Sequence, residues 1–352
     1  MADENTKARI RTAILALPET TPTAMYGMFE ILSSVGVVWQ QVMGDGQVFP
    51  RFEVELVAVD DQPFCTLVGV PVTPGRSVVS DDVFDLVIVT DIDIRPDCDP
   101  REAWPEVAEW LSRQYAAGAT ICSVCTGAVL LARAGLLDGI EATTHWMAVG
   151  IMTQCFPGVL LRPERILQPA GKEHRIITAG GMSAWQDLLL YLIARYAGEE
   201  EARRAAKVYL LGDRSEGQLP FAAMLPRQHE DAVIGKCQEW VGAHYDDPAP
   251  VARMAALSGL NERTFKRRFK AATGFAPIDY VQSLRVEEAK HLLETSDMPT
   301  DQIGREVGYE EPAFFRRLFK RKTGTTLARY RQRFRRTATT GTGREPDRSL
   351  PG

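Results

Sequence analysis

A cysteine and a histidine in the first half of the chain have the setting of a reactive pair. The stretch "ATICSVCTGAVLLARAG" places Cys125 after a strand-like apolar run and before a helix-like run. A side chain on such a turn stands at the carboxyl end of a strand, which is the arrangement of a nucleophile elbow. The positive end of the following helix would lower the pKa of the thiol and favour the thiolate. His145, in "ATTHW", follows at the end of the next short strand, from where an imidazole could reach the thiol.

Several interpretations of this elbow stay open. Cys125 and His145 could be the catalytic pair of an amidohydrolase-like enzyme, or Cys125 could act alone as a thiol redox sensor. Cys125 could also line a ligand pocket, or simply be a small residue that fits a crowded turn. Cys122 belongs to the strand and would point away from the elbow. Because no second cysteine pair or histidine cluster accompanies it, we expect neither a metal site nor another cofactor.

The elements needed to position these residues alternate along the first half of the chain. Helix-like segments, several of them ending on glycine, separate and follow short apolar runs. The strand-like runs lie at 11–17, 51–59, 84–91, 119–124 and 175–181. Such alternation predicts an α/β fold with a mostly parallel sheet covered by helices on both faces. The segment 178–187, "TAGGMSAWQD", would bring its glycines to the same carboxyl edge of the sheet, where open α/β folds bind ligands.

The distribution of charge separates the chain into two parts. Of the 352 residues, 1–249 hold 20 Lys and Arg against 34 Asp and Glu, whereas 250–336 hold 19 against 10. An acidic body with a basic block indicates that only the C-terminal part meets a polyanion. The irregular spacing of six cysteines argues against a disulfide framework, and the polar N-terminus against a signal peptide. With no apolar run long enough to span a membrane, we expect a cytoplasmic protein.

A repeat occupies the basic part. The segment 264–285, "TFKRRFKAATGFAPIDYVQSLR", is matched fifty residues later by 314–335, "FFRRLFKRKTGTTLARYRQRFR". The corresponding aromatic residues are Phe265 and Phe315, Phe269 and Phe319, and Tyr280 and Tyr330. A short helix and a glycine-containing turn precede each copy. The pattern predicts two helix-turn-helix units, at about 251–272 and 300–323, joined by a long helix at 277–296.

The basic residues of this repeat fall on one side of each second helix. There the phenylalanines at i and i+4 face the core, so Arg and Lys occupy the outer face. The candidate DNA-binding residues are Arg263, Lys266, Arg267 and Lys270 in the first copy, and Arg316, Arg317 and Lys320 in the second. An α-helix fits the major groove of B-DNA, where these side chains can pair with guanine edges or with phosphates. The repeat therefore predicts binding to double-stranded DNA.

The segment from about 230 to 333 resembles the AraC/XylS-type DNA-binding domain over its whole length, including the "GY" before the second recognition helix. The resemblance implies that the first exposed residues of each recognition helix contact bases. These residues are Arg263, Lys266 and Arg267 in the first helix, and Pro312, Ala313, Arg316 and Arg317 in the second. Pro312 and Ala313 cannot donate side-chain hydrogen bonds. We therefore expect the second helix to make fewer direct contacts with bases, and its arginines to contact phosphate.

Residues 10–198 resemble the PfpI-type branch of the class I glutamine amidotransferase-like superfamily, and "AGLLDG" followed by "ATTHW" is close to the GlxA-like regulators, in which this domain is fused to AraC-type domains. The resemblance implies a flavodoxin-like sheet. In members of that superfamily, a carboxylate from the first strand-to-helix turn often joins the cysteine to the histidine. Here the turn "LPETTPTAMYGMFE" has Thr23 or Ala24 at the aligned position, and neither is acidic. We therefore expect a sensing domain that is not an enzyme.

These observations together predict a transcriptional regulator. We expect an effector-sensing domain at 10–212, a linker at 213–229, a DNA-binding domain at 230–336 and a disordered tail at 337–352. Binding of a small-molecule effector would change the geometry of the protein and hence its affinity for promoter DNA. The candidate ligand-binding residues are Cys125, Thr126, Gly127, His145, Thr23 and Gly181. The resemblance further implies a homodimer that acts on RNA polymerase and is not attached to a membrane.

Overall fold

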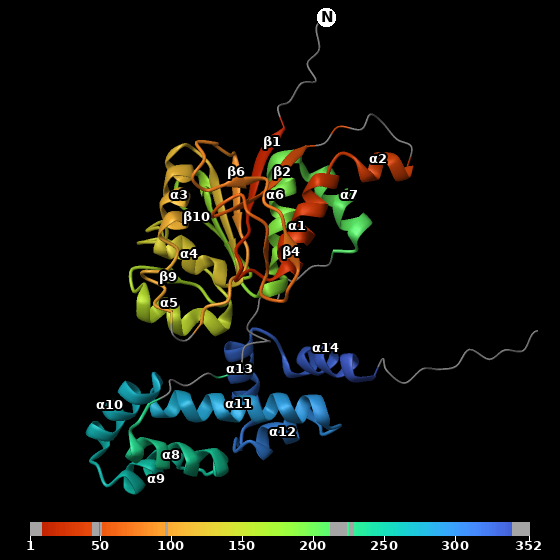
Figure 1. Cartoon of the computed structure of the whole chain (residues 1–352). Coiled ribbons are helices and arrows are strands. Elements are labelled where there is room, and N and C mark those ends of the chain that lie inside the picture. Colours follow the sequence, from red (N-terminus) through yellow and green to blue (C-terminus); the bar gives the residue numbers. More distant parts are fainter. Residues whose placement is uncertain are drawn as a thin grey trace, which may run out of the picture. The chain divides into compact units, whose positions relative to one another are not determined.

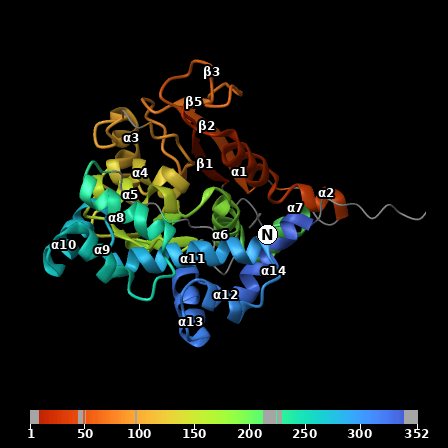
Figure 2. The same ribbon diagram turned by 90° about the horizontal axis from the view of Figure 1, so that it is seen from below.

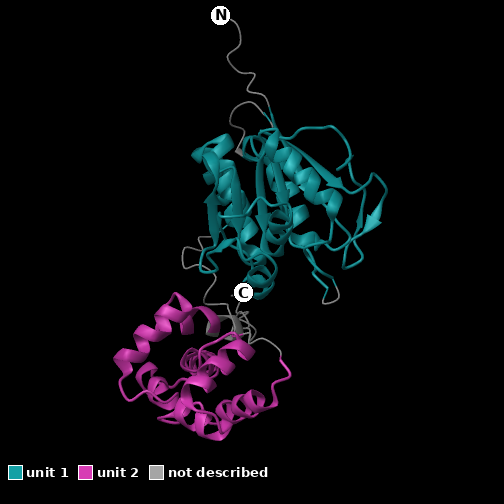
Figure 3. Cartoon of the chain, turned by 90° about the vertical axis from the view of Figure 1, so that its left-hand side faces the viewer, with its two compact units in different colours: residues 1–218 teal, residues 219–352 magenta. Residues whose placement is uncertain are grey.

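The computed structural model describes residues 9–43, 49, 51–95, 98–211, 224 and 229–339. The chain divides into two compact units, Met1–Gln218 and Leu219–Gly352, which Figure 3 shows in different colours. The linker predicted at 213–229 falls almost entirely outside the described residues, as does most of the tail predicted at 337–352. The last helix, α14 (Leu327–Thr339), extends three residues into the range predicted for that tail.

Within the described residues, the first unit is built on a seven-stranded sheet in the order β10-β11-β7-β6-β1-β2-β5. Its strands are β1 (Ile10–Leu15), β2 (Phe52–Ala58), β5 (Arg76–Ser77), β6 (Leu86–Val89), β7 (Thr120–Val124), β10 (Leu167–Ala170) and β11 (Ile176–Ala179). Neighbouring strands pair in parallel, except that β10 runs antiparallel to β11. The predicted mostly parallel α/β sheet is confirmed. Outside it, the strands that pair are β3 (Phe64–Cys65) with β4 (Pro71–Val72), and β8 (Glu141–Ala142) with β9 (Leu160–Leu161).

Helices cover both faces of the central sheet (Figure 1). The helices on one face are α1 (Pro22–Ser34), α6 (Trp185–Ala197) and α7 (Glu199–Tyr209), and those on the other are α3 (Pro105–Ala116), α4 (Ala128–Arg133) and α5 (Val149–Cys155). The short α2 (Val38–Met43) follows α1 and contacts α7. A separate apolar core lies on each face of the sheet. Burial on both faces explains why the central strands are continuous apolar runs, with every residue of β6 inaccessible to solvent.

The second unit is all helical in its described part, and the predicted double helix-turn-helix architecture is confirmed. Its helices before α14 are α8 (Ala232–Ala243), α9 (Pro250–Ser258), α10 (Glu262–Thr273), α11 (Pro277–Thr295), α12 (Thr300–Glu306) and α13 (Pro312–Thr323). Figures 1 and 2 show α9 and α10 toward one end of α11, and α12 and α13 toward the other. No helix in the described part of the chain has the length and apolar character needed to cross a membrane.

The long helix α11 contributes to two apolar clusters and so connects the helix-turn-helix units. Tyr280 and Val281 pack with the phenylalanines of α10, whereas Ala289 and Leu293 pack with those of α13. Because α11 is a single rigid rod, it fixes the distance between the two units along its axis.

Arg285, near the middle of α11, strengthens this connection. Its buried guanidinium donates hydrogen bonds to the carbonyl oxygens of Tyr245 (2.6 Å) and Asp247 (2.8 Å), in the segment between α8 and α9. A third bond reaches the carbonyl oxygen of Gly308 (3.1 Å), in the turn between α12 and α13 of the second helix-turn-helix unit. The guanidinium carbon also lies 4.8 Å from the ring centre of Tyr309. One charged side chain therefore satisfies backbone acceptors of two segments that are distant in the sequence.

Candidate functional site: a cysteine elbow and two recognition helices

Cys125 occupies a sharp turn between β7 and α4. Its backbone has a φ of 57°, in the left-handed region that side chains other than glycine rarely adopt. Its N–H donates to the carbonyl oxygen of Gly180 (2.9 Å), which follows β11. Its own carbonyl oxygen accepts from the Thr144 hydroxyl (2.8 Å). The turn therefore has the geometry of an elbow, held by both neighbouring segments, and the cysteine is 5% exposed.

The two residues after the cysteine have structural tasks. A Cβ atom on Gly127 would lie 2.5 Å from the carbonyl oxygen of Thr90 and 2.6 Å from that of Val89, so only glycine fits there. The Thr126 hydroxyl donates to the Ile92 carbonyl oxygen (2.6 Å) and accepts from the Ile92 N–H (2.9 Å). The Thr126 hydroxyl thus ties the elbow to the loop after β6. The expectation that both residues bind ligand stays a prediction.

A carboxylate that the sequence reasoning missed lies close to the elbow. Asp91 follows β6 and is 3% exposed. Its Oδ2 accepts a hydrogen bond from the hydroxyl of Thr21, at the start of α1, while its Oδ1 has no hydrogen-bond partner. The loops that carry these residues are joined by a bridge between Thr20 and Ile92. The one available signal was the position of Asp91 at the carboxyl end of a central strand, where α/β folds place functional groups.

The electrostatics of the elbow contradict the predicted thiolate. Burial, which is the largest cause, and the nearby Asp91 carboxylate together raise the pKa of the Cys125 thiol to about 12, and the backbone and hydroxyl of Thr126 oppose this rise only in part. Burial also raises the pKa of Asp91, although its hydrogen bond from Thr21 works in the other direction. The prediction considered the helix end but not the loss of water around the thiol, and this loss is the larger effect. Cys125 is therefore a thiol at neutral pH.

The imidazole of His145 is not placed as a base for this thiol. His145 follows the short strand β8, which pairs with β9 outside the central sheet. Its Nδ1 accepts a hydrogen bond from the Met147 N–H (3.1 Å) and so caps a short turn. In the neutral ring Nε2 then carries the proton, which leaves no free acceptor. Among the described residues no hydrogen bond joins His145 to Cys125, and burial lowers the pKa of the histidine.

The other predicted ligand residues lie around the same carboxyl edge of the sheet, with different exposure. Thr23 is exposed in the first turn of α1, whereas Ala24 is fully buried beneath it. Gly181 is half-buried just after β11 and begins the turn that leads into α6. The structure thus brings Cys125 and Gly181 to one edge of the sheet. It offers no acidic group in the first turn at the aligned position.

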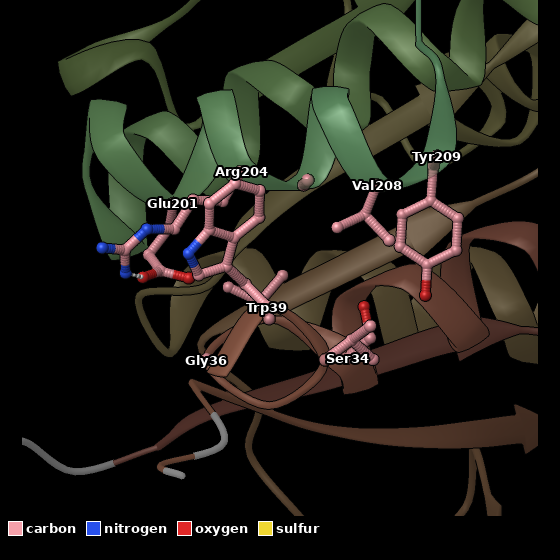
Figure 4. A pocket seen from close by; sticks show the side chains of 10 residues that line it. Ser34, Gly36, Trp39, Glu201, Arg204, Val208 and Tyr209 are labelled. Carbon is pink, nitrogen blue, oxygen red and sulfur yellow. Dashed lines mark hydrogen bonds and ion pairs between the residues drawn. The ribbon is translucent and has the colours of Figure 1, made fainter. Parts of the chain in front are cut away.

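A recess elsewhere in this unit is too small for a metabolite. It lies between the end of α1, α2 and α7, and Figure 4 shows Trp39 facing Glu201 and Arg204 across it. Its volume of about 10 Å³ is close to the minimum for one water molecule. In the part of the chain that the structure describes, no group of His, Cys, Asp and Glu side chains is arranged to hold a metal ion.

In the second unit, α10 and α13 have the same construction. Phe265 and Phe269 of α10, and Phe315 and Phe319 of α13, are fully buried. Each helix ends on a glycine in the left-handed conformation, Gly274 or Gly324, whose N–H donates to the carbonyl oxygen four residues earlier. The two helices therefore present equivalent positions to solvent in the same register.

All of the predicted DNA-binding side chains are exposed on these helices. Two of them form ion pairs: Lys266 with Glu262, and Arg316 with Asp301 (3.1 Å). Within the described residues, those that form no ion pair are Arg263, Arg267 and Lys270 on α10, and Arg317 and Lys320 on α13. A neighbouring cation that was not proposed for DNA, Arg268, instead holds Asp231 at the start of α8. The unpaired cations form an outward stripe on each helix.

A surface hollow of about 630 Å³ adjoins the first stripe. Aliphatic groups at the starts of α9 and α11 line it, including Val251, Pro277 and Ile278. Lys266, Arg267 and Lys270 line it from the side of α10. The cationic side chains of α10 therefore border a concave surface rather than a flat one.

Comparisons with known proteins agree with this architecture. Residues 41–194 match the DJ-1/PfpI family and residues 254–333 match a helix-turn-helix domain. The HTH-type transcriptional regulator CdhR of Pseudomonas aeruginosa is 29% identical over 226 residues, which cover 62% of this chain and 65% of that protein. The HTH-type transcriptional regulator GlxA of Rhizobium meliloti is 30% identical over 226 residues, which cover 63% of this chain and 68% of that one. The chain thus spans about two thirds of the length of these relatives.

Among solved structures, that of an AraC family transcriptional regulator from Pseudomonas putida covers 57% of this chain and 99% of its own, at 18% identity and a TM-score of 0.45. The two family matches and the curated relatives place the chain in the class of HTH-type transcriptional regulators. This chain belongs to the GlxA-like family of that class, with a DJ-1/PfpI domain followed by an AraC-type helix-turn-helix domain.

Proposed function

We propose that this protein regulates transcription by binding double-stranded DNA through its second unit, under the control of a small effector bound by its first. The observation that carries the proposal is the pair of equivalent helices α10 and α13, each with exposed cations in one outward stripe. Helices of this kind enter the major groove, where cations contact phosphates and guanine edges. The functional limits proposed are 10–212 for effector sensing and 230–336 for DNA binding.

DNA binding is tested with the full chain and operators selected from a random duplex pool. Exposed cations release counterions from phosphate, so the affinity should fall steeply as salt is raised. Arg263, Arg267, Lys270, Arg317 and Lys320 have no competing ion pair in the described part, and we assign them the main contacts. Lys266 and Arg316 would have to leave their carboxylate partners in order to contribute. The assignment would be refuted if no operator could be selected and the full chain showed no salt-dependent binding to duplex DNA.

The effector site proposed is the carboxyl edge of the sheet around the elbow. Cys125, Gly181 and Thr23 lie along this edge, and His145 follows the threonine that holds the elbow. Asp91 adds a buried carboxylate oxygen without a partner, which favours a ligand that supplies a hydrogen-bond donor. A thermal-shift screen of metabolites on the full chain tests this, since a ligand that binds the native state raises its melting temperature. A true effector should lose most of this shift in Asp91→Asn and Cys125→Ser, and keep it in Arg317→Ala.

The first unit is proposed to sense rather than to catalyse. A catalytic thiol must ionise, and the pKa of Cys125 is raised to about 12, while His145 Nδ1 is occupied by its own turn. The competing function is an amidohydrolase-like enzyme. Purified wild type and Cys125→Ser are compared for turnover of amides and of glyoxal-type substrates, alongside operator binding. We expect no turnover in either protein and operator binding in both; turnover lost in the variant would favour the enzyme.

A thiol redox sensor is the second alternative, and the same pKa argues against it because peroxide attacks the thiolate. Operator affinity should not change when the full chain is treated with peroxide, and mass spectrometry should recover Cys125 unoxidised.

Three further points belong to the proposal: action on RNA polymerase, a homodimeric state and a cytoplasmic location. The mass of the full chain measured by light scattering, with and without operator, tests the homodimer.

A further inference from the structure

The two recognition helices differ at one position in the outward stripe. In the common register of α10 and α13, Arg263 corresponds to Ala313, Arg267 to Arg317 and Lys270 to Lys320. Positions i, i+4 and i+7 lie on one side of a helix, and all three are exposed in both copies. The second helix therefore keeps the two later cations but has a methyl group where the first has a guanidinium. This position is nearest the helix N-terminus, the part that reaches base edges.

The neighbours of Ala313 make the tip of α13 apolar. Pro312 precedes it, and Phe314, which follows, is 41% exposed. The ring of Phe314 lies 5.6 Å from that of Tyr309. Arg316, the nearest cation, is held by Asp301 at 3.1 Å. The first turn of this recognition helix thus has no free hydrogen-bonding side chain to offer a base.

The floor of the major groove has one apolar group, the 5-methyl group of thymine, and small apolar side chains such as alanine contact it. Resting on the DNA binding proposed above, we propose that Ala313 is a specificity-determining residue that recognises thymine through this methyl group. The first recognition helix, with Arg263 at the same position, instead contacts hydrogen-bonding base edges or phosphate. The absence of a long side chain at Ala313 also lets the helix backbone approach the bases closely.

The size of the effect follows from the burial of one methyl group. Removing a methyl group from a buried contact should weaken binding by a factor of about four. Deoxyuridine removes only this group from thymidine, because base pairing and the hydrogen-bonding pattern in the groove stay the same. The proposal therefore predicts that replacing one thymidine by deoxyuridine weakens operator binding, although that base makes no hydrogen bond to the protein.

The test uses the full chain and an operator selected from a random duplex pool. Each thymine of the operator is replaced singly by deoxyuridine, and the affinity of wild type, Ala313→Gly and Arg263→Ala is measured. We expect one or two replacements to weaken wild-type binding about fourfold, and Ala313→Gly to bind thymine and uracil equally at those positions. Arg263→Ala, the matched variant in α10, should keep the full preference for thymine.

Folding of the variants is checked by circular dichroism. Ala313→Ser, which keeps a small side chain but adds a hydroxyl, provides a second variant that should also lose preference for the methyl group. An operator without a sensitive thymine would overturn the proposal, as would a preference that survives unchanged in Ala313→Gly. Failure to select any operator would refute DNA binding itself, and is thus distinct from the failure of thymine recognition.

Discussion

The hydroxyl of Thr21 donates a hydrogen bond to Asp91 Oδ2, so the first strand-to-helix turn and the end of β6 meet beside the cysteine elbow. The acidic group at this edge of the sheet is thus supplied by the loop after β6, while the first turn supplies only a hydroxyl. This carboxylate is bound by a threonine and not by His145, so the elbow has no cysteine–histidine–carboxylate chain. The same buried carboxylate gives the elbow a distinctive dependence on pH.

Replacing Asp91 by asparagine should stabilise the protein at neutral pH. Because its pKa is raised in the folded state, the carboxyl group stabilises the fold at low pH, and this contribution is lost as the pH rises through the raised value. Asparagine stays neutral and still accepts from Thr21. The melting temperature of Asp91→Asn should exceed that of wild type at pH 7 and approach it near pH 4. Asp82→Asn is the control. The hydrogen bond from Arg11 lowers the pKa of Asp82, so its ionised form stabilises the fold, and this variant should lower the melting temperature at pH 7.

The Cys125 thiol should react slowly with alkylating agents. With a pKa of about 12 its thiolate fraction at pH 8 is very small, so alkylation by iodoacetamide should be at least about a hundredfold slower than at an ordinary exposed cysteine. Cys65, which is exposed, serves as the reference within the same protein. Site-resolved mass spectrometry gives both rates, and equal rates would show that the thiol is ionised. Asp91→Asn should accelerate only Cys125.

An alanine at position 127 should destabilise the first unit. Its Cβ would meet two backbone oxygens at 2.5 and 2.6 Å, and the backbone of β6 cannot move without disturbing the sheet. We expect a loss of about 1–3 kcal/mol or more in the free energy of unfolding. Gly150→Ala, in α5, is the control, because no atom lies within 4 Å of its added Cβ. If both variants unfold at the same denaturant concentration, the close approach of the elbow to β6 is wrong.

Removing the guanidinium of Arg285 should destabilise the second unit. Arg285→Met leaves three carbonyl oxygens, in two segments distant in the sequence, without their donor, which should cost about 2–4 kcal/mol. Arg268→Met removes a more exposed arginine that pairs with Asp231 in contact with solvent, and should cost much less. Hydrogen exchange of the backbone amides of α11, followed as denaturant is added, reports on this unit. Equal losses in the two variants would mean that Arg285 does not connect the helix-turn-helix units.

The fold was largely predictable because its signals are local. The strands β6, β7 and β11 are buried along their whole length, as are the last four residues of β1 and the last three of β2, and these segments therefore appear as apolar runs. The edge strand β5 has two residues, too few for any period to show, and β10 contains a proline. In the second unit, the repeat itself gave the register of the phenylalanines.

The site was less predictable because it depends on contacts between distant segments. The elbow at Cys125 follows from local order along the chain, but Thr21 and Asp91 are seventy residues apart. Their meeting requires the bridge between Thr20 and Ile92, which has no local signal. The thiolate was wrongly predicted for a related reason, since the sequence shows a helix start but not how much water it excludes. The sequence places His145 after a short strand, and only the structure shows that its Nδ1 accepts a hydrogen bond from the Met147 N–H.

The central claim, that the outward stripes of α10 and α13 bind DNA, is tested most directly by the salt dependence of operator affinity. Full-length wild type is compared with Arg267→Ala, Arg317→Ala and, as control, Arg268→Ala. Loss of a phosphate contact should reduce the slope of log affinity against log salt by about 1, whereas loss of a base contact should cost about 1–3 kcal/mol and relax sequence preference. We expect Arg317→Ala to reduce the salt slope and Arg267→Ala to lower the affinity and relax the sequence preference. Arg268→Ala should do neither. Unchanged slope, affinity and preference in both stripe variants would contradict the account.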